Sequence, residues 1–161
     1  MTYHILETLA RYKQWADAGL YRVIMSNRAR IGPEDMGILI RILDHSHVVD
    51  QIFRSHLQGI PHDYESANSI TLPGLDEMAE AVARADRWYV NYVAAVADAE
   101  LLEAVPFTFT DGTPACMRRS EMLLHVMTHS AYHRGNAGIL LQKNGIPPNK
   151  DVLTRFVLES A

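Results

Sequence analysis

Apolar residues recur at steps of three and four along four long stretches of the chain, a spacing typical of amphipathic helices. In the first stretch the apolar positions are Ile5, Leu9, Tyr12, Ala16, Leu20 and Val23. The pattern predicts helices over residues 2–27, 33–58, 74–98 and 120–144. Glycine and proline mark the breaks between these helices, as expected for helix boundaries, at Gly32-Pro33, Gly59-Ile60-Pro61 and Asn144-Gly145.

The segments outside these helices predict three further features. Residues 61–73 are polar and form a loop long enough to cross the length of a bundle. Residues 105–110 alternate bulky and small polar side chains before Asp111-Gly112, a dipeptide favoured in type I′ turns, so we expect a short hairpin that returns over residues 113–117. The tail from Asp151 is partly apolar, and we expect it to pack back onto the body as a strand or short turn.

Four amphipathic helices must each bury an apolar stripe, and a four-helix bundle does this at the length of this chain. The chain has 161 residues, of which 48% are hydrophobic and 21% charged, which is ordinary for one globular domain. We therefore expect an all-α fold: a single four-helix bundle domain over residues 1–161, with a short β-hairpin before the last long helix.

Charge and composition argue against several classes of function. The net charge is −4 and Arg118-Arg119 is the only basic doublet, so we expect no nucleic-acid partner. No apolar run approaches the length of about 20 residues that a membrane helix needs, and no signal-peptide pattern opens the chain. The expected protein is cytoplasmic and does not interact with membranes. The single cysteine, Cys116, leaves no internal disulfide.

Three histidines recur every four residues in the last predicted helix, at His125, His129 and His133. Steps of four residues keep the three side chains within about 40° of one another on one helical face. Imidazole rings placed this way can converge on one metal ion.

A metal site inside a bundle needs ligands from facing helices, and the second predicted helix offers His45 and His47. On a helical wheel His45 lies within about 60° of the apolar residues Ile38, Ile42, Val49 and Ile52. His47 lies about 160° away, with the polar residues Asp44, Gln51 and Arg54 around it. We therefore expect His45 to point inward and His47 to point to water. The candidate site is His45, His129 and His133, with His125 as a fourth or accessory group.

Two charged residues near these histidines are given structural roles. Asp50 lies about 140° from His45, so we expect a cap, salt bridge or interhelical contact rather than metal ligation. Arg134 is expected to pair with an acidic side chain across the bundle or at a dimer contact.

Three segments carry a resemblance to a known family. They are Leu43-Asp44-His45 followed by Asp50-Gln51-Ile52-Phe53, the run from His129 to Asn136, and Tyr12-Lys13-Gln14-Trp15-Ala16-Asp17. Together they closely resemble the DinB/YfiT-like family of damage-inducible, metal-binding four-helix bundles. The resemblance implies an up-down-down-up topology, a long crossover between the second and third helices, frequent homodimers, and one divalent ion on three histidines. The ligand positions of that family match His45, His129 and His133.

Some members of the family are thiol-dependent S-transferases or isomerases, which implies a low-molecular-weight thiol or another small molecule as partner. Three neutral imidazoles leave open positions, the catalytic rather than the structural pattern for zinc. Zinc or nickel is the expected ion, with iron or manganese as alternatives. Ser130 stands where a zinc peptidase would have its glutamate after the first histidine, so peptidase chemistry is disfavoured.

Two main hypotheses for the function stay open, and no catalytic residue is assigned. The first is a metal-dependent transferase or hydrolase in which the ion activates a thiol or water. The second is a non-catalytic stress or interaction protein in which the ion ties two helices together; a metal-free bundle with buried histidines is a weaker third. If His125 completes a closed tetrahedral shell, the metal is structural, whereas an open position facing a pocket supports catalysis.

Overall fold

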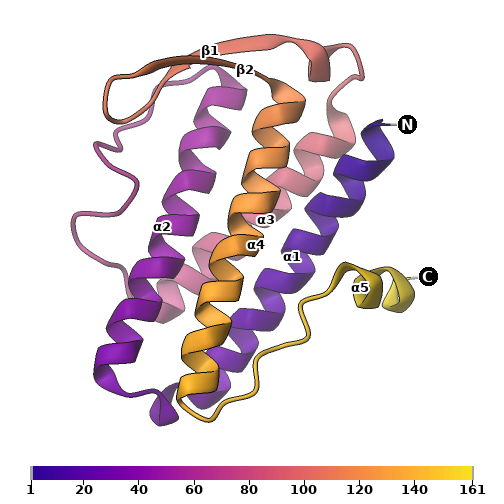
Figure 1. The fold of residues 1–161 in the computed structure, drawn as a ribbon. Coiled ribbons are helices and arrows are strands. Elements are labelled where there is room, and N and C mark those ends of the chain that lie inside the picture. The colour runs from indigo at the N-terminus through magenta and orange to yellow at the C-terminus, as the bar shows by residue number, and fades with distance from the viewer. Residues whose placement is uncertain (1, 161) are drawn as a thin grey trace.

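Four long helices form a bundle in the computed structural model, which describes residues 2–160 and their side chains from residue 5 onward. The helices are α1 Thr2–Asn27, α2 Pro33–Gln58, α3 Leu75–Ala95 and α4 Arg119–Lys143 (Figure 1). The predicted all-α bundle is therefore confirmed, and the helix boundaries differ from the expected ones mainly in α3, which ends at Ala95 rather than near residue 98.

The connection between α2 and α3 sets the topology of the bundle. Residues 59–74 run from one end of the bundle to the other, so that α2 and α3 point in the same direction (Figure 1). The predicted up-down-down-up order is confirmed, with α1 packed on α3 and α4, and α2 packed on α4. None of the helices in the described part of the chain combines the length and the apolarity needed to cross a membrane.

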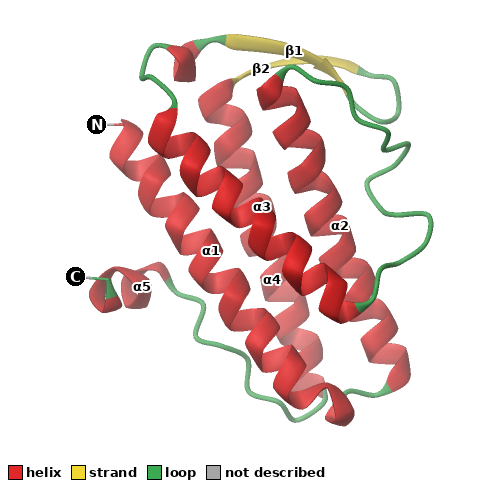
Figure 2. Cartoon of the chain, turned by 180° about the vertical axis from the view of Figure 1, so that it is seen from behind, coloured by secondary structure: helices red, strands yellow, loops and turns green. Residues whose placement is uncertain are grey.

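A two-stranded antiparallel hairpin lies across one end of the bundle, as Figure 2 shows. Strand β1 Ala104–Thr108 pairs with β2 Pro114–Arg118, which confirms the predicted hairpin. The turn is not the expected type I′. The amide of Gly112 donates to the carbonyl of Phe109, and within the described residues only glycines, Gly112 among them at φ 86°, have positive φ. A type I′ turn would need positive φ at Asp111 as well, so this is a three-residue loop with a left-handed glycine.

The C-terminal tail forms a short helix, α5 Leu153–Glu159, rather than the expected strand or turn. Its one buried side chain, Phe156, packs against the rings of Tyr12 and Trp15 in α1 at centroid distances of 5.9 and 5.8 Å. A helical turn presents one large apolar residue to a neighbour while exposing the others, which suits a tail with this single anchor.

The core consists of two apolar clusters at different levels of the bundle. One lies toward the hairpin and includes Leu6, Phe53 and Tyr89, and the other lies toward the opposite end and includes Leu20, Leu39 and Leu141. A group of buried polar and charged side chains lies between the two levels: Lys13, Asp17, Asp50, Asp86, Ser130 and Arg134. The candidate metal ligands sit beside this polar layer.

Candidate metal centre

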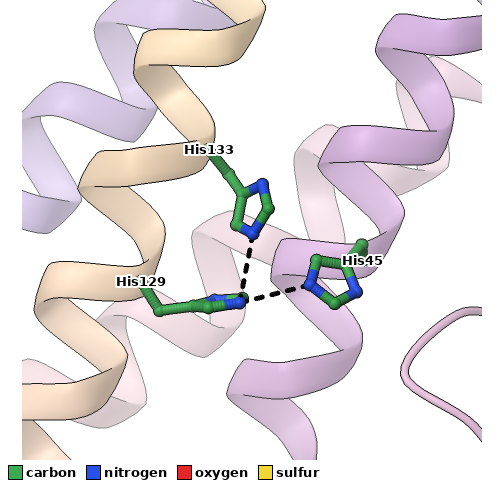
Figure 3. A group of neighbouring side chains, drawn as sticks. All are labelled: His45, His129 and His133. Carbon is green, nitrogen blue, oxygen red and sulfur yellow. Dashed lines mark hydrogen bonds between the residues drawn. The ribbon is translucent and has the colours of Figure 1, made fainter.

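Helices α2 and α4 bring three histidines together, as Figure 3 shows. His129 and His133 are one turn apart on α4, and His45 faces them from α2. The Nε2 atom of His129 lies 3.2 Å from Nε2 of His45 and 3.1 Å from Nε2 of His133. All three side chains are partly buried and offer ligand atoms within 4.8 Å of one another. The three residues singled out from the sequence are thus the three that the fold brings together.

The crossover loop fixes the ring of His45. Its Nδ1–H donates to the carbonyl of Ala67 at 2.8 Å, which leaves the Nε2 lone pair directed at the other two histidines. Metal-binding histidines are commonly oriented by such a bond from the second ring nitrogen. The loop is held in turn by Asp44, whose carboxylate accepts bonds from the amide and the hydroxyl of Ser69 at 2.8 and 2.6 Å. Sequence reasoning missed Ala67 because a backbone carbonyl leaves no signal in the residue pattern.

The surroundings favour the neutral form of the two histidines on α4. Burial lowers the pKa of His129 to about 3, and the neighbouring histidines lower it further in the same direction. The pKa of His133 is also below its ordinary value, because of burial and the adjacent His45. Neutral imidazoles have a free lone pair, which is the form that binds a metal ion.

The donor set fits a divalent ion. Two nitrogens that each lie about 2.1 Å from a tetrahedral ion are about 3.4 Å apart. The observed Nε2–Nε2 separations of 3.1 and 3.2 Å are close to that value, so a small movement of the rings would admit an ion.

His125 does not join this group. Its ring stacks on that of His129 with a centroid distance of 5.3 Å, and it packs against Phe53 at 4.6 Å. It is not among the residues whose ligand atoms converge. Among the histidine, cysteine and acidic side chains of the described chain, three therefore converge on the site and none supplies a fourth ligand.

A pocket of about 130 Å³ adjoins the site at His129. His129 contributes to the pocket wall, together with the polar residues His56, Thr110 and His125. The rest of the wall is apolar and aromatic, formed by Val49, Ile52, Phe53, Ala67, Phe107 and Phe109. Phe107 and Phe109 come from the hairpin segment, so the hairpin closes one side of the pocket.

Comparison with known families places the chain in one of them. The sequence model of the DinB family matches residues 1–158. The chain belongs to the DinB family. The match confirms the resemblance seen in the three sequence segments, and it accords with a histidine triad that could hold a metal ion. No curated protein matches the chain.

A buried ionic cluster lies next to the triad of this DinB-family protein. Nζ of Lys13 is 2.9 Å from Asp17, 2.7 Å from Asp50 and 2.5 Å from Asp86, so that one ammonium group joins α1, α2 and α3. Asp50 makes the expected interhelical salt bridge. Helix α4 joins through Arg134, whose guanidinium lies 3.1 Å from Asp17.

Arg134 also reaches the C-terminal segment, with its Nε 2.6 Å from the carboxylate of Asp151. The expected pairing of Arg134 across the bundle is therefore confirmed. Ser130 belongs to the same cluster, since its hydroxyl accepts a bond from Arg134 at 2.9 Å and lies 3.4 Å from Asp17. Because this hydroxyl points into the ionic cluster, it does not face the pocket.

The expected exposure of His47 is wrong. His47 is partly buried, its Nδ1 is shielded from solvent, and burial lowers its pKa to about 4. The face of α2 that packs inward is rotated about the helix axis from the one that the helical wheel predicts. Ile38, assigned to the inward face, is 43% exposed, whereas Asp44, assigned to the outward face, is 1% exposed because it anchors the crossover loop.

Proposed function

We propose that this DinB-family protein is a metal-dependent enzyme in which His45, His129 and His133 hold one divalent ion. Zinc or nickel is the expected ion. The observation that supports the proposal is the convergence of three imidazole Nε2 atoms beside a pocket, with no fourth histidine, cysteine or carboxylate of the described chain to close the coordination shell. An open position of this kind is characteristic of catalytic zinc sites, whereas structural sites are closed by four protein ligands.

A bound divalent ion would lower the pKa of a coordinated thiol or water and so supply a nucleophile at neutral pH. The residues of the chain orient and enclose the reactants. His45 is held in place by Ala67, and the aromatic wall around His129 excludes water from one side of the site. Besides His129, the polar groups of the pocket wall are His56, Thr110 and His125.

The pocket also favours a type of substrate. A dry cavity of about 150 Å³ lined by apolar side chains is large enough for one benzene ring. The pocket beside His129 has a volume of about 130 Å³ and mainly apolar walls, so we propose a small substrate with a single ring or a branched aliphatic group. Group transfer to a low-molecular-weight thiol, or hydrolysis, fits this arrangement. Peptidase chemistry does not fit, because Ser130 stands in place of the glutamate of a zinc peptidase and its hydroxyl lies in the ionic cluster.

The alternative is a non-catalytic protein in which the ion only ties α2 to α4. That function needs no pocket beside the site, and His125, which would have to complete the shell of a structural ion, stacks beside His129 instead. The observed arrangement therefore favours the enzyme.

Metal analysis tests the ligand assignment. We expect the protein purified without chelator to contain about one divalent ion per chain, and His129→Ala to lose at least nine-tenths of it, because His129 is central to the triad. His62→Ala is the matched control, since His62 is partly buried but lies outside the triad. Equal metal content in the two variants would contradict the assignment.

A conjugation screen separates the enzyme from the structural alternative. Metal-loaded protein is incubated with a panel of low-molecular-weight thiols and small aromatic electrophiles, and with esters to detect hydrolysis. Turnover that chelation abolishes and metal restores supports catalysis. A chelator that melts the protein without any activity in the loaded form would favour the structural role.

We also propose that the chain forms homodimers, as the family resemblance implies. The outer face of α4 exposes Leu124, Tyr132 and Ile139, which lie within about 80° of one another around the helix. Between them Gly135 faces open space, with no atom within 4 Å of the position of an added Cβ, so no contact inside the chain explains this glycine. Exposed apolar stripes of this kind are common at protein interfaces.

A further inference from the structure

A small cavity lies between the metal-site residue His133 and the buried ionic cluster. Its volume is about 20 Å³, and its wall includes Asp17 and Arg134 of the cluster. A cavity needs roughly 10–15 Å³ of such space to hold one water molecule. The cavity is therefore of the size of one water.

The polar atoms that lack partners are concentrated around this cavity. In the described part of the chain eight buried side-chain polar atoms have no hydrogen-bond partner in the protein. Five of the eight belong to residues that line the cavity: Tyr21, His47, Asp50, His133 and Arg134. Buried polar groups without a partner are rare in native proteins, and five around one cavity point to a shared ligand.

The chemistry of the five atoms matches a water molecule. Nη2 of Arg134 is an obligatory donor, and Nδ1 of His133 carries the proton when Nε2 faces a metal ion. Oδ1 of Asp50 is an acceptor when the carboxyl is ionised, while the Tyr21 hydroxyl and Nδ1 of neutral His47 can accept. Water accepts two hydrogen bonds and donates two, so one molecule can serve both donors and two of the three acceptors. A cation is disfavoured because the guanidinium of Arg134 forms part of the wall.

We propose that this cavity is a binding site for one structural water, which accepts a hydrogen bond from Nδ1–H of His133 and donates one to Asp50. The water does for His133 what the Ala67 carbonyl does for His45: it fixes the ring with its Nε2 lone pair toward the ion. It also connects the ligand to the ionic cluster that holds the four helices. The inference rests on the proposed function only in treating His133 as a ligand.

The variant Tyr21→Phe tests the proposal, because an unpaired hydroxyl and a hydroxyl bonded to the water predict opposite changes in melting temperature. Tyr21 is 7% exposed and its hydroxyl has no protein partner. If the hydroxyl is unpaired, its removal relieves a buried polar group and raises the melting temperature of the metal-free protein. If it holds the water, its removal lowers the melting temperature and weakens zinc binding by about tenfold, as the loss of outer hydrogen bonds does at metal sites. Zinc affinity is measured by competition with a chromophoric chelator.

A second variant changes the cavity without touching a polar group. Val82 lines the cavity from α3, and Val82→Ile adds a methylene group that displaces the water. Val93→Ile is the matched control, because Val93 is also buried on α3 but does not line the cavity. We expect several-fold weaker zinc binding in Val82→Ile and unchanged binding in Val93→Ile.

The water itself is detected by nuclear Overhauser effects from water to the methyl groups of Leu43 and Val82 in the metal-free protein. We expect these effects in the wild type and their loss in Val82→Ile. Their absence in the wild type, or a Tyr21→Phe variant that is more stable with unchanged zinc affinity, would overturn the proposal. If the wild type binds no zinc, the proposed function fails, and the Overhauser effects and melting temperatures alone decide the water site.

Discussion

At the scale of single residues, the ammonium group of Lys13 is a buried charge that contacts three carboxylates. Lys13 is 1% exposed and is paired with Asp17, Asp50 and Asp86. With Arg134 the buried part of the cluster has three carboxylates and two cations, a net charge of −1 if all five groups are ionised, and Arg134 is shared with the partly buried Asp151. Such a cluster is stable only while its charges balance, because each unpaired buried charge carries a large desolvation cost.

The variant Lys13→Met removes the cation while keeping much of the volume of the side chain. Three carboxylates would then face one another with only Arg134 nearby, so we expect a loss of about 3–5 kcal/mol in the free energy of unfolding. Urea denaturation measures the change. Arg84→Met is the control, since it breaks only the exposed pair with Glu80 and should cost less than about 1 kcal/mol. Similar losses in both variants would contradict this account of the cluster.

The excess carboxylate in the cluster predicts a dependence of stability on pH. Burial raises the pKa of Asp86 to about 7 and that of Asp50 to about 6, although Lys13 opposes the shift in each. A carboxyl whose pKa is higher in the folded state stabilises the fold below its unfolded pKa of about 4. This contribution is lost as the pH rises through the folded pKa values, with a slope of at most about 1.4 kcal/mol per pH unit for each proton released.

We expect Asp86→Asn to reduce this loss between pH 5 and pH 8, because the remaining two carboxylates balance Lys13 and Arg134. The free energy of unfolding is measured at several pH values by urea denaturation of variant and wild type. The comparison between the two chains is essential, because buried histidines such as His47 have lowered pKa values and the opposite slope. Parallel dependence of the free energy of unfolding on pH in variant and wild type would rule out that the folded cluster holds a proton on a carboxyl group.

At the scale of the elements, hydrophobic periodicity and glycine or proline signals located all four long helices and the hairpin. They failed where contacts distant in the sequence decide the structure. The tail became α5 because Tyr12 and Trp15 receive Phe156, and the inward face of α2 is rotated because Asp44 binds the crossover loop. The four-residue spacing of histidines identified His129 and His133 on α4. It could not identify the backbone carbonyl that orients His45.

Helix α5 is expected to behave as a separate unit of low stability, because Phe156 is its one buried residue. Phe156→Ala should release α5 and leave the bundle folded. Hydrogen exchange measured by mass spectrometry should then be fast in α5 and unchanged in α1 to α4. Val157→Ala, at an exposed position, is the control and should change neither. Global destabilisation by Phe156→Ala would show that α5 belongs to the core.

At the scale of the whole molecule, a bundle with a polar middle layer is held together by apolar clusters on both sides of that layer. The layer joins all four long helices through Lys13 and Arg134, and the histidine triad adds a connection between α2 and α4. Charged residues on the apolar faces of helices could not be placed from the sequence, because their burial depends on partners from three other helices.

The proposed homodimer makes a prediction at this scale. Tyr132 is 67% exposed on the outer face of α4, and Tyr132→Glu should give a monomer in light scattering after size exclusion, since a buried charge without a partner disfavours an interface. The same substitution at Tyr64, which lies in the crossover loop, is the control and should leave the dimer intact. A wild-type monomer at all concentrations would exclude the dimer.

Because the carbonyl of Ala67 orients the ring of His45, the affinity of the site for an ion depends on how well the crossover loop is ordered. Asp44 and His45 are neighbours in sequence, yet one anchors the loop and the other is oriented by it. A ligand or partner that draws residues 66–69 away from α2 would therefore weaken the site without touching any of the three histidines. The binding of a small molecule over the crossover and the release of the ion would then be linked, each opposing the other by the same free energy.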